Sequence, residues 1–406
     1  MGSGFTSWGT IDPYTVGAIS LKPGTEGSLL WMKEYSAPAL GTTRSLVAWD
    51  PDSRVFVMRD KETLVHFGYS IDTGNQIWGP TEPTNDYTFF RTNTHVAYGK
   101  IYYAGYGGIL YCYDIKTGQK LWTYGDGGVG NSTFSGLGTS WGTYPVFVDV
   151  IADDKVYLGT TEHSPGAPYY KNTEFRCVNA TTGEEIWTLL GWGTGMDAGV
   201  DVAADGFFVF LNCYDQKLYC IGKGPSAMTV EAPMTSLELG QSLVIRGTVT
   251  DIAAGTNQDE PAARFPNGVP AVSDESMTSW MEYVYMQKPR PMDTIGVQVT
   301  LSVVDANGNY RDIGTTTTND GFFSFTWKPD IEGQYTVYAS FAGSESYWPS
   351  HSVTAFNVDQ AAPTPAPMQE VAVPPTDMYI LSGVAAIIIA IAIVGIVLLI
   401  AIRKRP

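Results

Sequence analysis

The sequence predicts an all-β protein that carries a single membrane-spanning helix near its C-terminus. Gly, Pro and Tyr are abundant, with 44, 24 and 24 copies, while charged residues make up only 16% of the chain. This composition is typical of many short strands joined by tight turns. The 406 residues exceed what one compact core accommodates, so two or more folded units are expected.

A short element recurs four times in the first half of the chain, with a glycine followed four residues later by a tryptophan. The four pairs are Gly27 and Trp31, Gly74 and Trp78, Gly118 and Trp122, and Gly183 and Trp187. In the last three copies a threonine precedes the glycine, at Thr73, Thr117 and Thr182. A polar side chain closes such a turn and glycine supplies a positive φ. Each copy therefore predicts one β-hairpin whose tryptophan enters the next strand.

The spacing of the copies is typical of propeller blades. Consecutive glycines are 47, 44 and 65 residues apart (74 − 27, 118 − 74 and 183 − 118), and a four-stranded blade takes about 40 to 50 residues. The longest interval contains two insertions, at 125–144 and 162–172. Residues 1–225 therefore resemble the β-propeller repeats of the PQQ-like (quinoprotein-type) family, whose blades carry a Thr-Gly-x-x-x-Trp element.

This resemblance implies a partial propeller of about four to five blades. The first visible blade lacks its inner strands, and the last, from Gly206, stops before a strand that bears tryptophan. We expect an open arc, with a full ring only in a longer parent protein. Either an N-terminal segment with a signal peptide is missing, or export runs through the C-terminal tail, because residues 1–14 show no basic region followed by an apolar one.

Quinoprotein dehydrogenases of this fold carry a vicinal cysteine pair, a tryptophan floor, and acidic and asparagine ligands for calcium. The present sequence has no adjacent cysteines. Cys112, Cys177 and Cys220 occupy the same position in successive repeats, which predicts small buried core residues. A disulfide between Cys213 and Cys220 is left open. We predict no cofactor, and PQQ with calcium enters only under an alternative in which active-site residues lie in further N-terminal blades.

Residues 226–359 change to longer alternating strands separated by turns such as DANGN and NDG, and this predicts an immunoglobulin-like β-sandwich. The segment 274–286 departs from the alternation because its apolar residues recur at helical spacing. These residues are Met277, Trp280, Met281, Val284 and Tyr285. We expect an inserted helix, capped by Ser273 or Asp274, that packs either on the sandwich or against the propeller or a partner.

The C-terminus predicts a stalk, a membrane anchor and a short tail. Residues 360–377 are rich in Pro and Ala and should form an extended spacer. Residues 378–402 contain no charge and are long enough to cross a hydrocarbon core of ~30 Å. The tail 403–406 begins with Arg403, Lys404 and Arg405, which favours a cytoplasmic C-terminus and extracellular N-terminal domains. A tail-anchored arrangement with a cytoplasmic propeller is the alternative.

Candidate binding residues lie in the insertions. Propeller loops gather over one face, and we expect Trp141, Tyr144, Tyr169 and Tyr170 to form an aromatic surface that suits a glycan or a peptide. Two glycosylation sequons start at Asn131 and Asn179, and they matter only outside the cell. Of the two, Asn131 is the expected acceptor, since Asn179 is also a turn residue.

No metal site or catalytic residue is predicted. The four histidines, at positions 66, 95, 163 and 351, show no metal-ligand spacing. Asp305, Asn307 and Asn309 alternate as in calcium loops, but the bidentate glutamate of an EF-hand is absent, so a hairpin turn is favoured. The formal net charge of −17 excludes the basic footprint of a nucleic-acid-binding protein.

Three functions follow as hypotheses. The first is a non-enzymatic cell-surface module that displays a propeller for ligand or protein binding, because structural repeats are intact while catalytic residues are absent. The second is a membrane-anchored PQQ-dependent dehydrogenase. The third is a scaffold for the assembly of membrane complexes, as in other propellers of this repeat class. The order of propeller, sandwich, stalk and anchor resembles archaeal cell-surface proteins.

Overall fold

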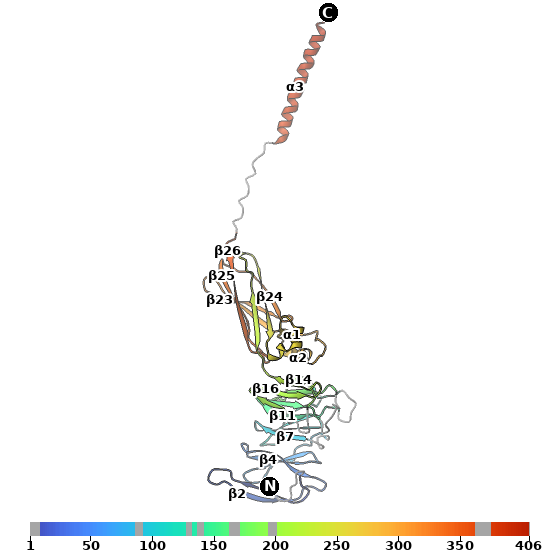
Figure 1. The fold of residues 1–406 in the computed structure, drawn as a ribbon, viewed down its shortest axis with the longest axis vertical. Coiled ribbons are helices and arrows are strands. Elements are labelled where there is room, and N and C mark those ends of the chain that lie inside the picture. The colour runs from blue at the N-terminus through green and yellow to red at the C-terminus, as the bar shows by residue number, and fades with distance from the viewer. Residues whose placement is uncertain are drawn as a thin grey trace.

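The computed structural model describes residues 9–85, 92–126, 132–135, 142–161, 171–193, 201–361 and 375–405. Strands dominate the fold, as the sequence predicts, and a long apolar helix ends it (Figure 1). The first half of the chain has the propeller-type fold.

The described residues of this first half form five antiparallel sheets, and each uses strands that are consecutive in the chain. The first sheet has two strands, β1 (Tyr14–Ile19) and β2 (Leu29–Tyr35). The second has four, namely β3 (Arg44–Asp50), β4 (Val55–Asp60), β5 (Val65–Ser70) and β6 (Gln76–Trp78). The third contains β7 (Thr92–Ala97), β8 (Lys100–Gly105), β9 (Leu110–Asp114) and β10 (Lys120–Tyr124).

The fourth sheet contains β11 (Phe147–Ala152), β12 (Lys155–Gly159), β13 (Glu174–Asn179) and β14 (Glu185–Leu190). Among the described residues the fifth contains β15 (Val202–Ala204), β16 (Phe207–Asn212) and β17 (Lys217–Ile221). The sheets stack in chain order, with the first and the fifth at opposite ends (Figure 1). Their first strands contact one another along the stack, β3 with β7, β7 with β11 and β11 with β15. Among the described residues, the sheets form an open series.

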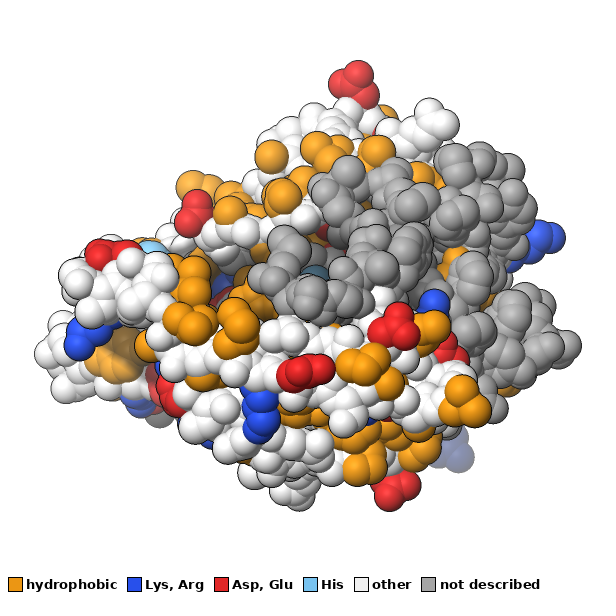
Figure 2. Space-filling model, turned by 90° about the horizontal axis from the view of Figure 1, so that it is seen from below, with side chains coloured by type: hydrophobic (Ala, Val, Ile, Leu, Met, Phe, Trp, Pro, Cys, Tyr) orange, Lys and Arg blue, Asp and Glu red, His pale blue; other side chains and the backbone are white. Residues whose placement is uncertain are grey.

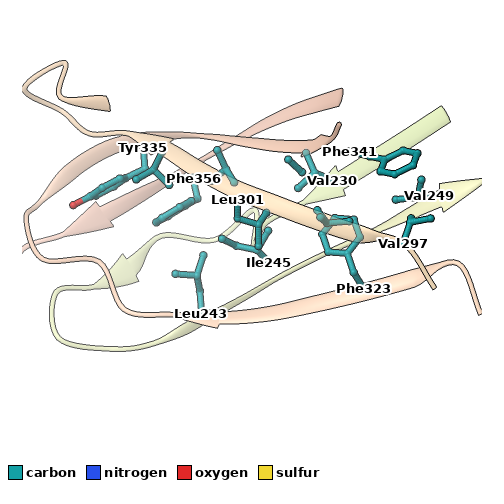
Figure 3. Close-up of a cluster of buried hydrophobic side chains, with 14 of the residues drawn as sticks. Val230, Leu243, Ile245, Val249, Val297, Leu301, Phe323, Tyr335, Phe341 and Phe356 are labelled. Carbon is teal, nitrogen blue, oxygen red and sulfur yellow. The ribbon is translucent and has the colours of Figure 1, made fainter. Parts of the chain in front are cut away.

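The second half of the chain forms two sheets around one apolar core. One sheet contains β18 (Ser226–Glu231), β20 (Leu243–Asp251), β21 (Val269–Pro270) and β24 (Phe322–Trp327). The other contains β19 (Leu237–Glu238), β26 (Ser350–Asp359), β25 (Gly333–Phe341), β22 (Gln298–Val304) and β23 (Tyr310–Thr317). Alternate residues of both sheets, including Ile245, Leu301 and Phe323, are buried between them (Figure 3). This is a β-sandwich, and its immunoglobulin-like character stays a prediction.

Two short helices lie at the end of the sandwich near the fifth sheet, α1 (Asp259–Arg264) and α2 (Met277–Tyr285) (Figure 1). Short 3₁₀ turns precede them at Ala254–Asn257 and Asp274–Ser276. The expected capping by Ser273 or Asp274 is wrong, because neither side chain bonds the helix N-terminus. The Asp274 carboxylate instead accepts hydrogen bonds from the loop at 344–346, so it ties α2 to the sandwich.

The helix α2 packs in both of the directions that the sequence left open. Trp280 and Val284 are buried within the sandwich half. Met281 and Met286 instead pack against the apolar cluster between the fourth and fifth sheets. Glu282 Oε1 accepts a hydrogen bond of 2.9 Å from the backbone N–H of Leu190, at the end of β14. The helix therefore joins the sandwich to the repeat sheets.

The C-terminal helix α3 (Thr376–Arg403) contains 28 residues. Its most apolar 18-residue stretch has a mean hydropathy of 3.4, and no residue of that stretch is buried. At 1.5 Å per residue the helix is about 42 Å long, enough to cross a membrane core of ~30 Å. The predicted apolar helix is thus present as a candidate membrane span. Most of the predicted stalk, 362–374, lies outside the described residues.

Candidate functional site

The repeated glycines and tryptophans meet between neighbouring sheets. A Cβ atom added to Gly74 would lie 2.7 Å from the ring of Trp31 in the preceding sheet. An added Cβ atom on Gly118 would likewise lie 2.5 Å from the ring of Trp78, and one on Gly183 would lie 2.6 Å from the ring of Trp122. We call these three contacts the Trp–Gly docking pairs. Any side chain larger than hydrogen would clash there, and all three glycines also have positive φ.

Two of the tryptophans add a hydrogen bond to the next sheet. The indole N–H of Trp31 donates to the carbonyl of Ile71 at 2.6 Å, and that of Trp78 donates to the carbonyl of Ile115 at 2.8 Å. The equivalent carbonyl in the fourth sheet, that of Ala180, accepts from the Tyr102 hydroxyl instead. The repeat therefore encodes the hairpin and the contact to the following sheet.

The two remaining repeat residues lack this arrangement. Gly27 has a positive φ of 78° but no heavy atom within 4 Å of an added Cβ, because no described sheet precedes it. Trp187, in the fourth sheet, packs against Tyr157 and Phe208 and shares its cluster with Met281 of α2.

The long connections all leave from one face of the stack. In each four-stranded sheet the Thr-Gly turn and the turn between the first two strands lie at one end of the strands. The antiparallel order then places the connection between the second and third strands, and those between sheets, at the other end. We call this other end the loop face. The strands that flank the connections 79–91, 125–146, 160–173 and 191–201 end or begin at this face.

Of the four aromatic residues predicted for this face, Trp141, Tyr169 and Tyr170 lie outside the described residues. Tyr144 is on the loop face but only 5% exposed, and its hydroxyl donates to the backbone carbonyl of Lys171. Tyr144 thus holds two connections together rather than presenting its ring to a ligand. The aromatic surface as a whole stays a prediction.

An arginine fixes the base of the loop face. Arg176 in β13 is fully buried, and its guanidinium donates to the carbonyls of Glu174 at 2.7 Å and Ser132 at 2.9 Å. The Ser132 hydroxyl in turn donates to Glu185 Oε2 at 2.7 Å. Burial raises the pKa of Glu174, and the nearby Arg176 opposes that rise. These bonds tie the connection 125–146 to the fourth sheet.

A second polar group, which is a pair of aspartates, was not predicted from the sequence. Asp149 in β11 and Asp201, just before β15, bring two buried carboxyl groups together between the fourth and fifth sheets. Burial, and then the charge of Asp201, raise the pKa of Asp149 well above its usual range. The local signal is an acid within the apolar strand FVDVIA, but its partner is remote in sequence.

The cysteine prediction is right for two residues and wrong for a third. Cys112 and Cys177 are fully buried, and burial raises the pKa of both thiols to about 12. Cys220 holds the same strand position but is exposed, because no further sheet covers β17 on that side among the described residues. All four cysteines are free thiols, so Cys213 and Cys220 are not joined in this structure.

Other predicted residues have structural partners. Asn179 Oδ1 accepts from the backbone N–H groups of Thr181 and Thr182, at 2.8 and 2.9 Å, which closes its turn. Asp305 Oδ1 likewise accepts from Asn307 and Asn309, so the predicted hairpin turn is confirmed. Asn131 lies outside the described residues, and glycosylation stays a prediction. In the part of the chain that the structure describes, no group of three or more His, Cys, Asp or Glu side chains is placed to hold a metal ion.

Comparison with known proteins agrees with the repeat assignment. The model of the PQQ_2 family, outer membrane protein assembly factor BamB, matches residues 19–160. This range runs from the end of β1 to the end of β12, so it includes the second and third sheets and the first two strands of the fourth. The chain is therefore similar to BamB-type repeat proteins over about a third of its length. No curated protein sequence matches it.

Two solved structures illustrate the range of the similarity. BamB from Moraxella catarrhalis is 11% identical, with a TM-score of 0.30, over 85% of this chain and 88% of that one. Quinohemoprotein alcohol dehydrogenase from Comamonas testosteroni is 16% identical, with a TM-score of 0.27, over 49% of this chain and 40% of that one. At these TM-scores the superpositions decide nothing, and the propeller-type fold rests on the sheets and the family match.

Proposed function

We propose that this protein is a membrane-anchored, non-enzymatic scaffold that displays its propeller-type sheets outside the cytoplasm to bind a protein partner. The loop face carries this proposal, because four long connections begin and end at strand ends on this one side of the stack. Such a composite surface on a rigid support is a common place for recognition. The matching family model, described as an assembly factor, supports the same class of function.

The cross-linking pattern in native membranes tests the face that binds. Lys171 lies on the loop face and Lys116 lies in a Thr-Gly turn at the opposite end, and both are exposed. With an amine-reactive cross-linker, we expect links to another protein through Lys171 and none through Lys116. Links through Lys116 alone would contradict the proposal.

The orientation is a separate part of the proposal. Arg403, Lys404 and Arg405 follow the candidate span and favour a cytoplasmic C-terminus. We expect a Met234→Cys variant, in a Cys220→Ser background, to react with a membrane-impermeant maleimide in intact cells, since Met234 is fully exposed on the sandwich. An Arg405→Cys variant should react only after lysis. The reverse pattern would support the tail-anchored arrangement.

The dehydrogenase hypothesis makes an opposite prediction for PQQ. When the full chain is incubated with PQQ and calcium, a scaffold should show no bound quinone absorbance and no dye-linked alcohol oxidation. A stoichiometric quinone spectrum with alcohol oxidation would replace the scaffold by an enzyme.

A further inference from the structure

The first strands of the fourth and fifth sheets bring together two aspartates that are 52 residues apart (201 − 149). Asp149 lies in β11, Asp201 directly precedes β15, and these two strands are in contact. Their carboxyl groups lie within hydrogen-bond reach of each other. The pair therefore bridges two neighbouring sheets at their inner edge.

Three of the four carboxyl oxygens of this pair are buried without a donor. Both oxygens of Asp149 and Oδ1 of Asp201 find no hydrogen-bond partner among the described residues. The remaining contact of Asp201 is to the backbone N–H of Leu211. Two buried carboxylates without a cation or a set of donors are strongly unfavourable. The pair therefore favours either a shared proton or a bound cation between its two carboxyl groups.

The backbone makes room for this arrangement. The pairing of β11 with β12 shifts between Val148 and Val150, so Asp149 is the extra residue of a β-bulge. Bulges turn a side chain in a direction that regular pleating would not allow. On the neighbouring strand β12, a Cβ atom on Gly159 would lie only 2.5 Å from Asp149 Oδ2. Any side chain at position 159 would therefore clash with the Asp149 carboxylate.

We propose that the carboxylates of Asp149 and Asp201 bind one hard divalent cation, whose remaining ligands are water or backbone oxygens. A single shared proton would join only two of the three partnerless oxygens. A cation such as Ca²⁺ or Mg²⁺ takes about six oxygen ligands and satisfies all three. The bound ion would link the fourth sheet to the fifth, beside the attachment of α2. The proposed scaffold function does not depend on it.

The test uses the full chain in detergent, stripped of metals with a chelator. Thermal unfolding is measured after separate additions of CaCl₂, MgCl₂ and MnCl₂, and calorimetric titration gives the stoichiometry. We expect at least one cation to raise Tm and to bind once per chain. Asp149→Asn and Asp201→Asn should each weaken binding at least tenfold. Asp205→Asn is the matched control, because Asp205 is exposed in the neighbouring β15–β16 turn.

A third variant separates charge from geometry. Gly159→Ala keeps both carboxylates but pushes a methyl group toward Asp149 Oδ2, and it should also weaken cation binding. If no cation binds the stripped wild-type chain, or if binding persists in both Asn variants, the proposal is wrong. A wild-type chain that ignores all three salts and gains stability only as pH falls would assign a shared proton to the pair instead.

Discussion

The same glycine-tryptophan element has different surroundings inside the stack and at its first sheet. At Gly74, Gly118 and Gly183 a tryptophan of the preceding sheet lies against the glycine, whereas nothing lies within 4 Å of a Cβ on Gly27. All four glycines nevertheless adopt positive φ. The motif therefore dictates the local turn in every copy. Whether it also makes an inter-sheet contact depends on the neighbour.

Side chains show the same contrast between the interior and the two ends. Ile19, Tyr69 and Val178 are equivalent, because each follows the residue that pairs with the repeat tryptophan of its sheet. Ile19 in the first sheet is 57% exposed, whereas Tyr69 and Val178 are 3% and 0% exposed. At the other end Leu218 is 71% exposed, while its equivalent Leu110 is fully buried. Hydrophobic side chains are visible on the surface at the first-sheet end (Figure 2). Side chains in this fold are thus buried where two sheets pack against each other, which we call a junction, and not within a single sheet.

The largest effect is expected from removing an interior indole. Trp78→Ala deletes a side chain that is only 9% exposed and leaves the Ile115 carbonyl without its donor. Such a change should lower the free energy of unfolding by about 3–5 kcal/mol. Trp49→Ala is the control, because Trp49 is 63% exposed, and it should cost less than about 0.5 kcal/mol. Denaturant titration of both variants in detergent measures the difference, and equal losses would contradict the junction model.

The next effect isolates the Trp–Gly docking pairs from the turn itself. Gly118→Val and Gly27→Val share the strain of a side chain at positive φ, but only at position 118 would the added side chain meet an indole, that of Trp78. Gly118→Val should therefore be less stable than Gly27→Val by about 1–3 kcal/mol, the usual cost of overpacking. The same denaturant titration applies. A Gly27→Val variant that is as unstable as Gly118→Val would show that an unseen neighbour covers Gly27.

An interior junction also makes stability depend on pH. His66, between the second and third sheets, is 2% exposed, and burial followed by the charge of Arg59 lowers its pKa from 6.5 to about 3. Below pH 6.5 the His66 imidazole binds a proton in the unfolded chain but stays neutral in the folded chain. The free energy of unfolding therefore decreases as pH falls toward 3. The slope from this group should approach ~1.4 kcal/mol per pH unit. His66→Phe should flatten this pH dependence, and His351→Phe, which replaces an exposed residue of β26, is the matched control.

Much of the fold followed from local patterns. Thr73, Thr117 and Thr182 mark their hairpins because Thr-Gly turn chemistry acts within a few residues, and the apolar run at the C-terminus needs only its length. The Asp149–Asp201 contact could not be predicted in this way, since it joins different sheets through a bulge that no local pattern signals. The exposure of Cys220 was missed for a related reason. Its strand position is identical to that of Cys112, and only the lack of a covering sheet among the described residues distinguishes them.

The last prediction sharpens the comparison at a single equivalent position. Val178→Thr places a hydroxyl in a fully buried junction between the third and fourth sheets, and it should cost about 1–3 kcal/mol because no partner for the hydroxyl is provided. Ile19→Thr makes a similar change in the first sheet, where the side chain already faces solvent, and should stay within about 0.5 kcal/mol. Denaturant midpoints of the two variants give the comparison. If Ile19→Thr proves as costly as Val178→Thr in the full chain, the outer face of the first sheet is covered in solution, and the contrast between interior and end does not hold.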